Sequence, residues 1–257
     1  MNRAAALVLL ALAIPASSQA PRLESKSATV QYEIGEDYYY GKNGVQDFVQ
    51  AADWYTRSAK NGYAQAQYSL GFMYRFGQGV PQDYIEGLRW LKLAAAQNHP
   101  SAEAEIGQMY KFGLGVTQDD AVAVSWYKKS ANHGDARGEC DLAFAYQEGE
   151  GVPQDYVQAM RWYRKSAEQG FGASMWNLGT LYSAGWGTPQ NFVEAYFWYD
   201  LAVSVKIENL ATKDRIKLSD DRDQAASHLS STALVQTQER AKKWFDTHIA
   251  IADQDSR

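Results

Sequence analysis

Residues 70–83 of this chain read LGFMYRFGQGVPQD, and Trp90 follows. The apolar residues at the start of this stretch recur at three- and four-residue spacing, which is typical of an amphipathic helix. The segment 77–81 contains two glycines and a proline, which cannot continue that helix cheaply. Asp83 is a favourable N-terminal cap for a second helix. The stretch therefore predicts a helix, a tight loop and another helix.

The same arrangement returns every 36 residues along the chain. The tryptophan series is Trp54, Trp90, Trp126, Trp162 and Trp198. A tyrosine series runs through Tyr38, Tyr74, Tyr110, Tyr146 and Tyr182, and a glycine series through Gly41, Gly77, Gly113, Gly149 and Gly185. Constant spacing in several registers predicts an all-α solenoid of antiparallel helix pairs. Its five repeats are 28–63, 64–99, 100–135, 136–171 and 172–207.

Small residues inside the first helix of each unit predict how the pairs pack. Glycine stands there in four units and alanine in one, at Gly35, Gly71, Gly107, Ala143 and Gly179. A glycine within a helix costs about 1 kcal/mol relative to alanine, so we expect a close approach of the second helix as compensation. We expect the opposing side to consist of Ala59, Ala95, Ala131 and Ala167, and the repeated tryptophan to fill the space between neighbouring pairs.

The ends of the second helices carry their own signals. Glu86 stands three residues after Asp83, as in a capping box. Glycine or asparagine near the C-terminal end predicts a left-handed backbone conformation, at Gly62, Asn98, Gly134 and Gly170.

The N-terminus has the features of a secretory signal. Arg3 precedes an uninterrupted apolar run at 4–14, and small residues follow it. We expect residues 1–18 to be a signal peptide cleaved after Ser18, with a disordered lead-in at 19–27. The protein is then exported, to the periplasm rather than fully secreted, and does not span the membrane after cleavage. The alternative is a short uncleaved anchor.

Composition narrows the class of protein. The 257 residues contain 46% hydrophobic residues, enough for a core, and their formal charge of −5 argues against nucleic acid as a partner. A single cysteine excludes an intrachain disulfide.

Beyond residue 204 the repeat fades, and residues 208–248 are expected to form capping helices. We expect the first of them to be broken around 219–221 and the last to start near Ser230. We expect 249–257 to be a frayed tail.

The repeated motif resembles the Sel-1-like repeat family, a relative of tetratricopeptide repeats. The residues that carry the resemblance are Leu70, Gly71, Tyr74, the loop 77–80, Asp83, Trp90, Ala94 and Ala95. The first unit departs from the motif, because Asn43 replaces the second loop glycine. The resemblance implies a right-handed superhelix and a role as an adaptor for protein complexes.

By analogy with tetratricopeptide arrays, one face of each first helix is expected to line a concave groove. That face is unexpectedly aromatic, and polar residues lie among its rings, a composition that suits the recognition of a protein or peptide. The candidate partner-binding residues are Tyr68, Phe72, Arg75, Phe76, Gln108, Lys111, Phe112, Phe144, Gln147, Trp176 and Thr180. The alternative is that these rings are buried between adjacent first helices.

The sequence contains little that predicts a catalytic or a metal-binding site. None of the four histidines has a second ligand at helical spacing, so we expect no metal, and no nucleotide or other cofactor motif is present. Ser125 and Lys128 match the Ser-x-x-Lys signature of serine β-lactamases, but the other motifs of those enzymes are absent. We expect no catalytic residues and a non-enzymatic adaptor. A β-lactamase-like hydrolase and a cell-wall glycan binder remain the alternatives.

Overall fold

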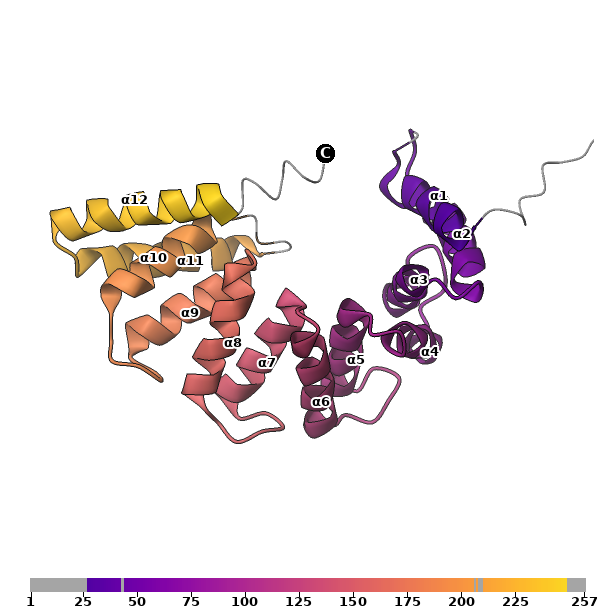
Figure 1. Ribbon diagram of the computed structural model, residues 1–257, viewed down its shortest axis with the longest axis horizontal. Helices are drawn as coiled ribbons and strands as arrows, with labels where there is room; N and C mark the ends of the chain where they lie inside the picture. Colours follow the sequence, from indigo (N-terminus) through magenta and orange to yellow (C-terminus); the bar gives the residue numbers. More distant parts are fainter. Residues whose placement is uncertain (1–26, 43, 206, 208–209, 249–257) are drawn as a thin grey trace, which may run out of the picture.

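The computed structural model describes residues 27–42, 44–205, 207 and 210–248, which form twelve α-helices and no β-strand. The helix pairs follow one another along a curved path (Figure 1). The five pairs are α1 (Ala28–Tyr40) with α2 (Phe48–Lys60), α3 (Ala64–Phe76) with α4 (Tyr84–Ala95), α5 (Pro100–Phe112) with α6 (Asp120–Asn132), α7 (Ala136–Glu148) with α8 (Tyr156–Glu168), and α9 (Gly172–Ala184) with α10 (Phe192–Ser204). The all-α solenoid with a period of 36 residues is confirmed.

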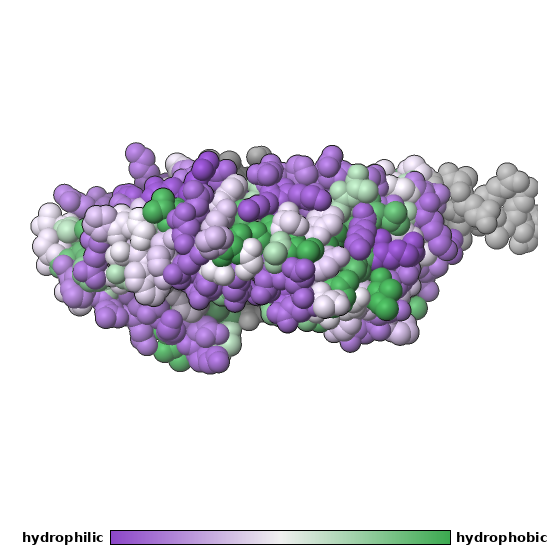
Figure 2. All heavy atoms as spheres, turned by 90° about the horizontal axis from the view of Figure 1, so that it is seen from below, coloured by the Kyte–Doolittle hydropathy of each residue, from purple (hydrophilic) through white to green (hydrophobic). Residues whose placement is uncertain are grey.

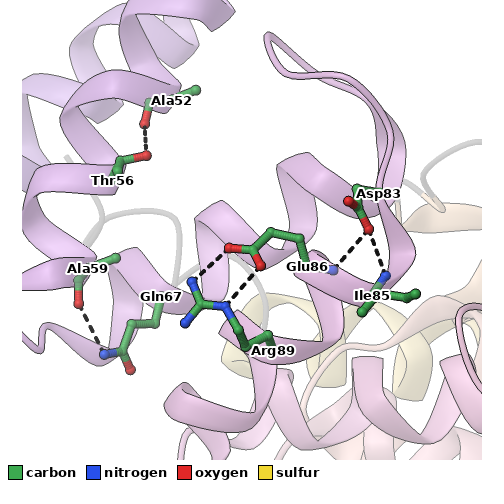
Figure 3. Close-up of polar contacts among 8 residues, drawn as sticks. All are labelled: Ala52, Thr56, Ala59, Gln67, Asp83, Ile85, Glu86 and Arg89. Carbon is green, nitrogen blue, oxygen red and sulfur yellow. Dashed lines mark hydrogen bonds and ion pairs between the residues drawn. The ribbon is translucent and has the colours of Figure 1, made fainter.

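Each pair turns at the loop that the sequence marks. The first helices end at glycines with left-handed φ angles, at Gly41, Gly77, Gly113, Gly149 and Gly185. The second helices begin after an aspartate or asparagine cap. Asp83 Oδ1, for example, accepts hydrogen bonds of 3.0 Å from the backbone N–H groups of Ile85 and Glu86 (Figure 3). The caps satisfy N–H groups that have no partner within the helix.

The expected capping box at Glu86 is wrong. Its carboxylate accepts two hydrogen bonds from Arg89, of 2.9 and 2.7 Å, instead of turning back to Asp83 (Figure 3). The guanidinium offers two charged donors to one carboxylate, which a single backbone N–H cannot match.

The partner of the small residues in the first helices is also different from the one expected. A Cβ atom on Gly107 would lie 2.4 Å from the ring of Tyr127, and one on Gly35 would lie 2.5 Å from the ring of Tyr55. The alanines lie one helical turn further along the second helix. A tyrosine ring, rather than an alanine methyl group, therefore occupies the space that the glycine leaves in these units, and Leu91 occupies it beside Gly71.

The repeated tryptophan lies between neighbouring pairs, as expected. Trp90 belongs to one core cluster with residues of α2 and α3. The series is not uniformly buried, however. Trp54, Trp90 and Trp198 are buried, whereas Trp126 and Trp162 are only partly so. A lysine ammonium covers the ring in both of these, Lys129 at 4.0 Å from the centroid of Trp126 and Lys165 at 4.4 Å from that of Trp162.

A periodic polar contact links the two ends of each of the first four units and was not anticipated from the sequence. The side chain just after or at the end of the second helix reaches a buried side chain in the first turn of the first helix, 30 residues earlier. The pairs are Asn61 with Gln31, Gln97 with Gln67, His133 with Glu103, and Gln169 with Glu139, at 2.7 to 2.9 Å. Gln67 also donates to the carbonyl of Ala59 (Figure 3). These bonds satisfy polar groups that packing removes from water.

Two further helices, α11 (Thr212–Ser227) and α12 (Ser231–His248), pack on α10 at the C-terminal end. The expected break around 219–221 is wrong, because α11 runs through it with Leu218 and Ala225 buried on one side. Ser230 Oγ caps α12 by accepting from Ala233, and Ala241 is buried. The predicted signal at 1–18 and the tail at 249–257 lie outside the described residues.

Candidate functional site

The first helices of the central units lie towards the inside of the curve. In Figure 1, α3 and α5 lie nearer the centre of the arc than α4 and α6, and α5 contacts both α3 and α7. The side of the molecule opposite the opening of the arc shows apolar patches scattered among hydrophilic residues (Figure 2). The candidate residues of the central units belong to these inner helices, α3 and α5, and to α7, which packs against α5.

Three aromatic side chains lie along α3. The ring centroids of Phe72 and Phe76 are 4.4 Å apart, and the Tyr68 ring stacks on His99 at 4.7 Å. Phe76 is 48% exposed, whereas Phe72 and Tyr68 are half-buried. Contacts between neighbouring first helices therefore cover only part of this surface.

The next units place a cation between two exposed rings. Phe112 is 58% exposed and Phe144 is 36% exposed. The Lys111 ammonium lies 5.9 Å from the ring centroid of Phe112 and 4.4 Å from that of Phe144, and it forms a 2.6 Å ion pair with Glu150. We call Phe72, Phe76, Phe112 and Phe144 the aromatic stretch. The surface around it is amphipathic, because the ion pair of Lys111 and Glu150 lies beside the apolar rings.

Arg75 lies beneath this surface instead of on it. Its guanidinium forms an ion pair with Glu105, whose other carboxylate oxygen accepts from Arg137 at 2.5 Å. Glu105 is buried, and burial together with the charge of Arg137 lowers the pKa of Arg75. The chain Arg75–Glu105–Arg137 joins α3, α5 and α7. Sequence reasoning missed Glu105 and Arg137, although the two acids Glu103 and Glu105 among the apolar residues of α5 were a signal.

Polar atoms without a partner lie next to this network. Among the described residues, Asp141 Oδ2 and the hydroxyls of Tyr127 and Tyr163 are buried and form no hydrogen bond. Burial raises the pKa of Asp141 to about 6, while the amide of Gln108 and the charge of Arg137 act in the opposite direction. In unit one the corresponding tyrosine, Tyr55, does donate to a carboxylate, that of Glu36.

Of the remaining candidates, Gln147 lies one helical turn after Phe144 in α7, whereas Trp176 and Thr180 of α9 are separate from the aromatic stretch. Trp176 packs under α11, where its indole N–H donates to Asp221 at 2.9 Å and the Lys217 ammonium lies over its ring. Thr180 donates to the carbonyl of Trp176, and Gln147 donates to Glu148. The surface of α9 is thus engaged by the cap.

Ser125 and Lys128 do not form a dyad. Ser125 Oγ donates to the carbonyl of Val122, and the Lys128 ammonium lies 5.8 Å from the ring centroid of Tyr146. Burial raises the pKa of the Cys140 thiol to about 12, which disfavours a thiolate nucleophile.

No group of three or more potential metal ligands occurs within the described ranges. None of the helices there is long and apolar enough to span a membrane.

Trp186 occupies the loop between α9 and α10. It is exposed, and its ring stacks on Tyr156 of the preceding unit with centroids 5.2 Å apart. Its ring therefore contacts the preceding repeat and is open to solvent.

The fold and this site define a class of helical-repeat protein with exposed aromatic rings on its first helices. The family model of the Sel1 repeat matches residues 28–63, 64–99, 100–135, 136–171 and 172–204. The chain therefore belongs to the Sel1 repeat family, whose solenoids are generally scaffolds for protein–protein interaction.

Solved structures show the same architecture. A Sel1 repeat protein from Oxalobacter formigenes superposes with a TM-score of 0.70 and 28% identity, covering 84% of this chain and 88% of that one. A protective antigen of uropathogenic Escherichia coli, c5321, gives a TM-score of 0.65 and 32% identity, covering 90% of this chain and 55% of the antigen. An immunity protein of Pseudomonas aeruginosa, Pa5087, shares the fold at 16% identity, a TM-score of 0.51, and coverage of 78% and 83%. No curated protein matches the sequence.

Proposed function

We propose that this protein is a non-enzymatic scaffold that binds a protein or peptide partner on its concave face. The observation that supports this function is the aromatic stretch around Lys111, where two phenylalanine rings are substantially exposed. Exposed rings beside a charged pair are typical of interaction surfaces, where a partner excludes water from the rings. Lys111 and Glu150 then provide polar contacts at the edge of the apolar surface.

The test replaces Phe112 and Phe144 together by aspartate. We expect this variant to lose partners that the wild-type chain captures from a cell-envelope extract, as identified by mass spectrometry. The matched control replaces Ile85 and Val157 by aspartate, since both are exposed but lie at the starts of second helices. Circular dichroism verifies that both variants keep their helicity. Capture that survives in the first variant as well as in the control would refute the assignment.

We also propose that the protein is exported, most favourably to the periplasm, under the direction of residues 1–18. The support is the short apolar run at 4–14 followed by small residues. The intact mass of the protein recovered from the envelope fraction tests this proposal. A chain that begins at Gln19 is expected, and a chain that still starts at Met1 would contradict cleavage.

A further inference from the structure

The first unit has a side that is covered in every later unit. In α3, Ala66, Leu70 and Met73 are fully buried, and they share a core cluster with residues of α2. One period earlier, the corresponding residues of α1 are Val30, Ile34 and Asp37. No second helix precedes α1 in the part of the chain that the structure describes. We call Val30, Ile34 and Asp37 the open seat.

The open seat is accessible. Val30 is 38% exposed, and Ile34 and Asp37 are half-buried. The other end of the array differs, because α11 and α12 pack on α10 there. Solenoids generally need polar caps at both ends to remain soluble, and this one shows a cap at the C-terminal end only, within the described residues.

The later units show which kind of element packs on the residues equivalent to the open seat. Its occupant there is a helix of 12 or 13 residues that approaches closely with small side chains. Ser166 of α8 and Ser174 of α9 are in hydrogen-bond contact at 2.7 Å, and a Cβ atom on Gly138 would lie 2.1 Å from Ser130 Oγ. The natural ligand of such a surface is therefore another short helix.

The charge of α1 selects among possible helices. Glu33, Glu36 and Asp37 are acidic, and α1 contains no basic residue. Glu36 accepts hydrogen bonds from Tyr32 and Tyr55, whereas Asp37 forms no ion pair with any described residue. Asp37 stands where later units bury methionine, alanine or leucine. A helix that covers Asp37 must bring a cation, because an unpaired buried carboxylate is costly.

The same charge argues against a second copy of this chain as the occupant. A head-to-head pair would bring two acidic α1 helices together, and like charges at such an interface oppose association. A head-to-tail arrangement would have to displace α11 and α12 from α10.

We propose that the open seat binds an amphipathic helix of a partner protein, with small and apolar residues against Val30 and Ile34 and a lysine or arginine opposite Asp37. The bound helix takes the place of a second helix of a preceding unit. This surface is distinct from the aromatic stretch, so the two sites can fail or succeed independently.

The probe is a fluorescein-labelled peptide with the sequence of residues 47–63, the segment that contains α2 and covers α3 in the array. Ala59 of α2 lies beside Gln67, and Phe48 lies beside Gly79, so Met73 lies nearer the start of α2. The peptide therefore carries Ala52→Lys to face Asp37, and a second peptide carries Ala52→Glu. Binding to the full chain is measured by fluorescence anisotropy.

We expect the lysine peptide to bind at least tenfold more tightly than the glutamate peptide, and less tightly at high salt. Ile34→Glu should abolish binding, while the matched control Ile85→Glu should leave it unchanged. Asp37→Lys should reverse the preference between the two peptides, a result that a merely structural effect would not produce.

Several results would overturn the proposal. One is the failure of both peptides to bind, and another is binding that Ile34→Glu does not weaken. A third is a dimer in sedimentation velocity that Ile34→Glu dissociates, which would make a second copy the occupant. The last is a gain of tenfold or more in peptide affinity on Leu23→Glu, which would show that the chain's own N-terminal segment covers the seat.

Discussion

Trp90 is 6% exposed and packs with α2 and α3, whereas Trp126 is partly buried and has the Lys129 ammonium over its ring. Replacement of a buried tryptophan by alanine costs about 3–5 kcal/mol, because the cavity adds to the lost burial. We expect Trp90→Ala to reduce the free energy of unfolding by that amount and Trp126→Ala to reduce it clearly less. Urea titration followed by circular dichroism measures both, and equal losses would contradict the difference in burial.

Asp141 gives the protein a defined pH dependence. Burial raises the pKa of its carboxyl from 3.8 to about 6, so the folded state holds this proton more tightly than the unfolded state. Its contribution to stability is therefore greatest below about pH 4 and is lost as the pH rises through about 6. Asp141→Asn should increase the free energy of unfolding at pH 7 by about 1–3 kcal/mol and have little effect at pH 4.

The measurement for Asp141 compares wild type and variant by urea titration at several pH values between 4 and 7. Other buried acids such as Glu139, whose pKa burial also raises, are common to both proteins and cancel in the difference. A difference between the two proteins that stays constant over this range would show that the carboxyl is not the titrating group.

Between elements, the second glycine of each loop forms the junction of neighbouring units. A Cβ atom on Gly79 would lie 2.1 Å from the carbonyl oxygen of Phe48, at the start of α2. Gly151 makes the same approach to Asp120 at 2.2 Å. In the sequence of the first unit Asn43 replaces this glycine, and no unit precedes it in the described residues; Gly44, one residue later, has nothing within 4 Å. The departure of the first loop from the repeat therefore has a physical reason.

Comparison of Gly79→Ala with Gly62→Ala distinguishes the stability cost of losing this close contact from the cost of backbone strain. Both glycines have positive φ angles, but only Gly79 meets a backbone atom. We expect Gly62→Ala to cost about 1 kcal/mol through strain alone. Gly79→Ala should cost more, because the loop must also move away from α2. Thermal denaturation of the two variants tests this order, and equal shifts of Tm would contradict it.

At the scale of the whole molecule, α11 and α12 cover the last unit. Trp244 of α12 meets the ring of Trp198 edge-on at 6.1 Å, and Leu218 of α11 is buried in the same core cluster. A chain that ends at residue 207 should expose this apolar surface, melt at a lower temperature and bind the dye ANS. A chain that lacks only 249–257 is the control, and the proposed role of the cap requires that it behave like wild type.

Much of the fold follows from the sequence because its repeats reinforce one another. The cap residues, the left-handed glycines and the tryptophan series are local or periodic signals, and each appears at the same place in the structure. The tyrosine that fills the space beside Gly107 has the same period, at Tyr55, Tyr127, Tyr163 and Tyr199. The period alone does not distinguish these tyrosines from the alanines four residues later, because both series repeat every 36 residues.

The candidate site was predictable only in part. The exposed rings of the aromatic stretch follow from the face of the first helix on which they stand. The burial of Arg75 under Glu105, and the covering of Trp176 by Asp221, depend on side chains 30 and 45 residues away. Contacts between residues that are so far apart in the sequence depend on the curvature of the array, which the pattern of apolar residues along a helix does not specify.

The sequence by itself determined the period, the helix boundaries within the repeats and the family, because capping and amphipathic packing act within one unit and repeat with it. Only the tertiary structure decided which members of a repeated series are buried, which charges are paired, and which end of the array has no capping helix among the described residues. These properties depend on what each unit packs against. A unit in the middle of the solenoid and a unit at its end carry the same motif but have different neighbours.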